Sequence, residues 1–162
     1  MQRHSHWPIT DHWRRILTVS LGVTLAMALT GLLSGIIHHP LLIAPLGASS
    51  VLLFGFPDAA FSQPRNFIGG SFLCAVIGLT FTHCIGDYWW TVASATSVAV
   101  ALMMITDTLH PPAGSLPMII CTLHAKWSFL IFPNLCGNIA VLCIALVYHR
   151  CTRKDPYPVY WI

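Results

Sequence analysis

Four apolar runs without a charged residue constrain the fold of this chain most strongly. The first, residues 16–37, has 22 residues, which at about 1.5 Å per helical residue spans the roughly 30 Å hydrocarbon core of a bilayer. A secretory signal peptide has a shorter apolar region and a cleavage site of small residues, and neither is present. We therefore expect this run to remain in the membrane. The other three runs cover residues 67–85, 88–106 and 127–148.

The composition supports an integral membrane protein. Of 162 residues, 56% are hydrophobic and 8% are charged, whereas about a quarter are charged in an average soluble protein. The Lys and Arg residues lie mainly near the two ends and form no patch for nucleic acid. No nucleophile and base pair, phosphate-binding loop or zinc-ligand spacing is visible in the sequence. We therefore expect the lipid bilayer as a partner, and no enzyme, cofactor, metal site or nucleic-acid partner.

Two shorter apolar segments, residues 41–56 and 113–123, are interrupted or preceded by proline. Proline removes a backbone donor and clashes with the preceding helical turn, so Pro45 and the three prolines of Leu109–Pro117 should break the helices. We predict an all-α polytopic membrane protein with four full transmembrane helices and two short broken or re-entrant segments. Its expected parts are a cytoplasmic tail at 1–15, one membrane domain at 16–148 and a cytoplasmic tail at 149–162.

The order of long and short segments repeats in two halves, residues 16–85 and 88–148. Three similarities support this interpretation, namely His39-Pro40 with His110-Pro111, Pro45–Ser49 with Pro111–Ser115, and Gln63–Asn66 with Phe132–Asn134. If the short segments cross the membrane, the second half is inverted; if they turn back, the halves are parallel. Six crossings place seven of the eight Lys and Arg residues on the cytoplasmic side, and four crossings place six there. The positive-inside rule therefore favours an inverted repeat with both termini cytoplasmic.

The two breaks are the candidate binding site for a small inorganic anion. A helix that begins inside the membrane presents unpaired N–H groups and the positive end of its dipole. Two such ends facing each other would form a concave anion site. Alternatively, the breaks only kink the helices, and serine hydroxyls satisfy the freed carbonyls. The candidate substrate-binding residues are Gly47, Ala48, Ser49, His110, Pro111, Pro112, Ala113, Gly114 and Ser115.

Three ionisable residues near the breaks are candidates for an entrance or for proton coupling. Asp107 paired with His110 would suit proton transfer, because histidine titrates near neutrality. His39 flanks the first break, and Arg65 could attract anions to an entrance. Alternatively, Asp107 and the histidines are hydrated at the headgroup boundary, and Arg65 caps a turn.

Two further patterns concern packing. Gly31 and Gly35 form a G-x-x-x-G motif that allows close helix approach, either within the chain or in a homo-oligomer. The six cysteines show no C-x-x-C pair, so we expect buried free thiols; a metal site or a disulfide framework is the alternative.

Three motifs resemble blocks of the HPP family of integral membrane proteins. They are Thr108–Ser115, Pro45–Phe54 and Ser62–Gly70, in the family's order, within a resemblance that covers about residues 15–150. The family is described as having four transmembrane helices, and its plant chloroplast and cyanobacterial members are associated with nitrite transport. The resemblance implies a small-anion transporter. Phe132–Asn134 lacks a counterpart of Arg65, and Asp107 is not assumed to belong to the family pattern.

The sequence thus leaves competing functions. The favoured one is a transporter of a small inorganic anion, nitrite in the first place, bound between the N-termini of the two broken helices and coupled to protons. A channel for small anions or neutral solutes is a variant, and a non-transporting membrane module that packs in a larger complex is the alternative. Without a chloroplast-type leader, a bacterial inner-membrane location is expected.

Overall fold

The structure is a computed structural model that describes the backbone of residues 9–161 and the side chains from residue 12 to residue 161. The described part is all-helical, and it contains no strand. Six α-helices are joined by shorter 3₁₀ and π-helical turns. The helices are α1 (Ile9–Ile37), α2 (Ala44–Gly55), α3 (Gly70–Ile85), α4 (Trp89–Ile105), α5 (Leu116–Thr122) and α6 (Cys136–Thr152).

Three helical segments, rather than four, are long and apolar enough to cross a membrane. They are His12–Ile37, Arg65–Ile85 and Trp127–Thr152. The predicted span at residues 88–106 forms α4, a shorter apolar helix of 17 residues. This helix ends at Ile105, and two residues later Asp107 takes a left-handed backbone conformation, with φ 52°, that does not continue a helix. The all-α prediction is confirmed, but four full-length spans are not.

The helix ends also differ from the predicted tails. α1 begins at Ile9, inside the segment predicted as a tail at 1–15, and α6 continues to Thr152. Residues 1–8 lie outside the described part of the chain.

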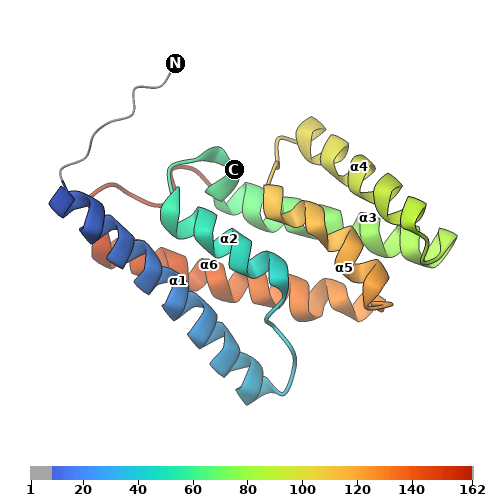
Figure 1. The fold of residues 1–162 in the computed structure, drawn as a ribbon, viewed down its shortest axis with the longest axis horizontal. Coiled ribbons are helices and arrows are strands. Elements are labelled where there is room, and N and C mark those ends of the chain that lie inside the picture. Colours follow the sequence, from blue (N-terminus) through green and yellow to red (C-terminus); the bar gives the residue numbers. More distant parts are fainter. Residues whose placement is uncertain (1–8, 162) are drawn as a thin grey trace.

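The chain direction alternates from each α-helix to the next, so the start of α1 and the end of α6 lie at the same end of the molecule (Figure 1). Each half packs its first helix on the last helix of the other half, α1 on α6 and α4 on α3. The short helices follow the same rule, because α2 packs on α1 and α6 whereas α5 packs on α4 and α3. This exchange of partners is consistent with two halves related by a two-fold axis, but the repeat itself stays a prediction.

The entries to α3 and α6 are built alike. A 3₁₀ turn and then a π-helical turn precede each helix, at Ala60–Ser62 and Arg65–Gly69 before α3 and at Trp127–Leu130 and Ile131–Leu135 before α6. A proline stands at each entry, Pro64 and Pro133, where its missing N–H removes a donor from the regular helical pattern.

Two glycines let the halves approach each other closely. A Cβ on Gly70 would overlap the backbone oxygen of Thr108, and a Cβ on Gly137 would lie 2.7 Å from the backbone oxygen of Leu41. Thr108 and Leu41 each precede the first residue of a short helical segment by three positions. The lack of a side chain at these two glycines therefore allows the two breaks to pack directly against the long helices.

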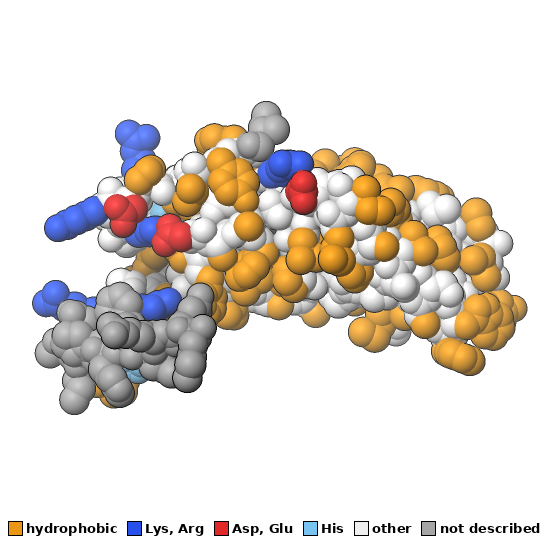
Figure 2. Space-filling view, turned by 90° about the horizontal axis from the view of Figure 1, so that it is seen from above, with side chains coloured by type: hydrophobic (Ala, Val, Ile, Leu, Met, Phe, Trp, Pro, Cys, Tyr) orange, Lys and Arg blue, Asp and Glu red, His pale blue; other side chains and the backbone are white. Residues whose placement is uncertain are grey.

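Two apolar clusters form the core. One joins α3, α4 and α5, and the other joins α1, α2 and α6, with Ile43 packed against both. Outside them, large apolar side chains are widely exposed, as a bilayer surface requires. In the view of Figure 2 the Lys and Arg side chains gather mainly at one end, and the opposite end is hydrophobic.

Two packing predictions hold only in part. Gly31 packs on Leu42 of the same chain, whereas Gly35 has no neighbour near the position of a Cβ. All six cysteines are free, but only Cys74 and Cys121 are buried. Cys136 is half-buried and Cys84, Cys143 and Cys151 are exposed. A thiol is compatible with such surfaces because it behaves as a small apolar group.

Candidate functional site

His110 is the centre of the candidate site. It occupies the N-cap position of the 3₁₀ turn Pro111–Ser115, which begins the second short segment, and its side chain is fully buried. Its Nδ1 lies 2.7 Å from the backbone oxygen of Phe61, and its Nε2 lies 2.7 Å from Ser49 Oγ in α2. A carbonyl only accepts hydrogen bonds, so Nδ1 carries the hydrogen. In the neutral ring Nε2 then accepts the hydrogen bond from the Ser49 hydroxyl.

The π-helical turn Arg65–Gly69 holds the backbone around His110. Asn66 Nδ2 donates to the backbone oxygen of Leu109 at 3.1 Å, and Arg65 Nη2 donates to that of Thr106 at 3.0 Å. The Phe67 ring lies 5.1 Å from the His110 ring between centroids. Pro112, three residues after Leu109, has no N–H and so cannot donate to the Leu109 carbonyl. The Asn66 side chain supplies that donor instead. The three motifs recognised in the sequence thus meet at one place.

The short segments have fewer unpaired donors than expected. Pro111 and Pro112 have no N–H, and the Ala113 N–H donates to the backbone oxygen of His110 at 3.0 Å. The Ser115 hydroxyl donates to the backbone oxygen of Pro112 at 2.8 Å, and the Ser49 hydroxyl is engaged by His110. The chain itself therefore satisfies these groups, and both ring nitrogens of His110 are bonded as well.

The remaining candidate residues differ in exposure. Ala113 is buried, whereas Ala48 and Pro111 are exposed. Gly47 and Gly114 are half-buried, and a Cβ on either would meet no atom within 4 Å. The two glycines therefore border open space, one on each short segment.

Asp107 and His110 do not form the expected pair. The His110 ring nitrogens contact Phe61 and Ser49 instead, and Asp107 is exposed. Asp107 lines a cleft of about 470 Å³ together with Arg65, which was the predicted entrance residue. The other residues that line this cleft are Ala60, Asn66, Met103, Met104, Leu109 and Tyr160.

His39 lies apart from this cleft, at the first break. Its ring stacks on Phe132, with centroids 4.9 Å apart. His39 is exposed, so it occupies a different setting from the buried His110.

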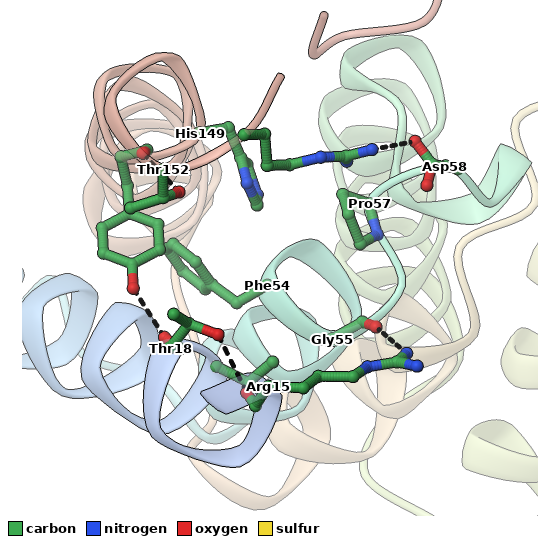
Figure 3. Close-up of a pocket in the computed structure, with 11 residues that line it drawn as sticks. Arg15, Thr18, Phe54, Gly55, Pro57, Asp58, His149 and Thr152 are labelled. Atoms are coloured by element: carbon green, nitrogen blue, oxygen red, sulfur yellow. Dashed lines mark hydrogen bonds and ion pairs between the residues drawn. The ribbon is translucent and has the colours of Figure 1, made fainter. Parts of the chain in front are cut away.

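A second cleft, which the sequence interpretation missed, lies among α1, α2 and α6 (Figure 3). Its volume is about 410 Å³, and we call it the basic cleft. Arg15 Nη2 donates to the backbone oxygen of Gly55 at 3.0 Å, and Arg153 Nη2 lies 2.6 Å from Asp58 Oδ1. His149 is buried at its wall. The basic residues near both termini were interpreted only as a topology signal, because their meeting depends on how α1 and α6 pack.

The C-terminal segment folds back toward the candidate site. The Tyr157 hydroxyl donates to the backbone oxygen of Ser62 at 2.8 Å, and the Val159 N–H donates to Gln63 Oε1 at 2.9 Å. Burial raises the pKa of the Tyr157 phenol. Ser62 directly follows Phe61, the carbonyl partner of His110, so the tail is tied next to the centre of the site.

The comparisons with known proteins agree with the motifs. The sequence model described as "HPP, transmembrane region" matches residues 8–158. A transmembrane protein of Dictyostelium discoideum is 34% identical over 160 residues, covering 87% of this chain and 55% of the relative. A second transmembrane protein of that organism is 32% identical over 131 residues, covering 74% of this chain and 41% of the relative. No solved structure matches the chain.

These relatives limit what can be transferred to the chain. The chain spans about half the length of the curated relatives that it matches. Both come from an amoeba, so they lend no support to the expectation of a bacterial member. The family match nevertheless covers nearly the whole chain and includes all three motifs gathered around His110. The chain therefore belongs to the HPP transmembrane family and is a multi-pass membrane protein.

Proposed function

We propose that this chain transports a small inorganic anion, nitrite in the first place, together with a proton. The observation that carries the proposal is the buried His110 at a helix break, bonded to Ser49 of the other half's short helix. The family resemblance supplies the class of substrate, and the geometry at His110 supplies a reason for the proton.

Electrostatics links the proton to the anion. Because Nδ1 is committed to the Phe61 carbonyl, a second proton can only be taken up at Nε2, which faces Ser49. A lone imidazolium beside Phe67 would be costly at this depth, since ionised groups inside a membrane need a partner. An anion that arrives with the proton neutralises it. The pair can then cross where neither charge crosses alone.

The way in which the helices of one half pack on those of the other supports transport rather than a non-transporting role. Inverted repeats commonly place a substrate site at their interface, and rocking of one half against the other exposes it to each side in turn. Here α2 contacts the start of the second short segment, so the Ser49–His110 contact joins the halves. The cleft lined by Arg65 and Asp107 is the proposed entrance. The positive-inside rule favours a cytoplasmic location for both termini.

Uptake of nitrite into proteoliposomes made with the purified chain tests this proposal. We expect nitrite to enter faster than in protein-free vesicles, and faster still when the outside is made more acidic. A chain that carried nitrate and chloride equally well would indicate a less selective anion transporter. No flux of any small anion above the protein-free rate would favour a non-transporting module within a longer protein.

A further inference from the structure

The basic cleft has the composition of a phosphate site at the level of the lipid headgroups. Among the described residues that line it, the charged ones are Arg15, Arg153 and Asp58. Arg153 Nη1 and His149 Nδ1 are buried and have no hydrogen-bond partner among the described residues. Unpaired buried polar atoms are costly, and a ligand with suitable oxygens would relieve that cost after a side-chain rotation.

An apolar groove adjoins this cleft and runs along the outer side of the contact between α1 and α6. It consists of two hollows of about 330 and 480 Å³ that share Leu29, Cys143 and Ile144. Tyr148 lines both the hollow of about 330 Å³ and the basic cleft, so the polar and apolar spaces meet at this residue. The other residues of the groove are Leu25, Leu33, Cys136, Ile139, Ala140 and Val147.

The groove has the depth of one membrane leaflet. From Tyr148 to Cys136 the helix rises about 18 Å at about 1.5 Å per residue, against the roughly 15 Å that half of a 30 Å hydrocarbon core measures. Trp13 is exposed near the start of α1 and Trp161 near the end of the tail, as expected for aromatic residues at a headgroup boundary. The charged cleft therefore lies where headgroups lie, and the groove lies where acyl chains lie.

We propose that the basic cleft and the α1–α6 groove together bind one anionic glycerophospholipid. Its phosphate lies between Arg15 and Arg153, and one acyl chain follows the groove past Tyr148 toward Cys136. A headgroup hydroxyl, as in phosphatidylglycerol, can donate to His149 Nδ1, whose ring already donates from Nε2 to the Leu53 carbonyl at 2.9 Å. Basic pockets between transmembrane helices on the cytoplasmic side are suited to anionic lipids. This site is distinct from His110 and independent of what the protein transports.

Native mass spectrometry of the full chain with added dioleoyl phosphatidylglycerol or dioleoyl phosphatidylcholine tests the site. We expect phosphatidylglycerol to bind more tightly than phosphatidylcholine, and Arg15→Gln or Arg153→Gln to weaken phosphatidylglycerol binding by about fivefold each. The matched controls are Arg14→Gln and Lys154→Gln, which remove the same charge from neighbouring residues that do not line the cleft. An equal loss in the controls would reduce the effect to general surface charge and overturn the proposal.

The acyl chain has its own test. Cys143→Trp should fill the groove and weaken both lipids, and a photoreactive acyl chain on phosphatidylglycerol should label α1 and α6. Labelling spread evenly over all helices would contradict the groove. Glycerol phosphate without acyl chains should compete poorly; competition as strong as that of the lipid would assign the cleft to a soluble phosphate ester instead. If Arg153→Gln fails to fold because its ion pair with Asp58 is lost, Arg15→Gln and Cys143→Trp still decide the outcome.

Discussion

The two breaks share a backbone plan and differ in chemistry. Each short segment starts three residues after a carbonyl that lies against a glycine of a long helix. The residue that caps the first break is Ile43, whereas His110 caps the second. The protein thus places one ionisable side chain in an otherwise matched pair of breaks. Under the proposed function, this single histidine supplies the chemistry at the breaks.

The largest effect is expected from a substitution at one of the two N-cap residues, His110, with Ile43 as the control position. His110→Gln should reduce nitrite uptake to the protein-free rate, because glutamine cannot take up a proton. Ile43→Leu should keep at least about half of the uptake, since a volume-conserving apolar exchange is well tolerated. Uptake into proteoliposomes of matched protein content measures both. Retained, pH-dependent uptake in His110→Gln would remove the histidine from the mechanism.

Bulk added at the open glycines should affect flux more than folding. Gly47→Leu and Gly114→Leu place side chains where no atom lies within 4 Å of the Cβ position, so the fold should accept them. We expect uptake to fall by roughly tenfold or more if this space is the path, a change of about 1.4 kcal/mol in the barrier. Thermal unfolding in detergent should change little. Normal flux in both variants would place the path elsewhere.

The packed glycines should show the opposite behaviour. Gly70→Ala and Gly137→Ala insert a methyl group against a backbone carbonyl, and overpacking of this kind costs about 1–3 kcal/mol. Thermal unfolding of each variant in detergent measures the loss. Gly35→Ala is the control, because its Cβ meets nothing within 4 Å and alanine favours a helix by about 1 kcal/mol. Equal losses at the two sites would strengthen the structural equivalence of the breaks.

The smallest effect is expected at Asp107. This side chain is exposed and lines the outer cleft, whereas His110 is bonded to Phe61 and Ser49. Asp107→Asn should therefore leave the pH profile of uptake unchanged, and asparagine suits the left-handed backbone at this position. Loss of the pH dependence would return Asp107 to the proton path.

The sequence predicted the membrane class and the places where helices break, because apolar length and proline act locally. It paired the breaks by the shared His-Pro dipeptide, which aligned His39 with His110. In the structure His39 is an exposed residue stacked on Phe132, and the residue that occupies the position of His110 in the first half is Ile43. The shared dipeptide therefore did not identify the equivalent residues, which are the N-cap residues of the two short segments.

The partners of the candidate residues could not be predicted from the sequence. Ser49 and Phe61 precede His110 by 61 and 49 positions, and Arg153 meets Asp58 across 95 positions. Such contacts depend on the register with which α2, α3 and α6 pack. The unpaired donors expected at the second break were overestimated for a local reason, since two adjacent prolines remove the N–H groups that would have formed them.

The tail anchored at Ser62 and Gln63 has a practical consequence. A reporter or a further domain fused after residue 162 would be attached to a segment that is hydrogen-bonded one residue away from the Phe61 carbonyl, the partner of His110. A folded domain attached there would disturb the backbone that orients the His110 ring. Fusions for localisation or purification are therefore safer with a flexible spacer, and a spacer-length series would measure how strongly the tail is coupled to uptake.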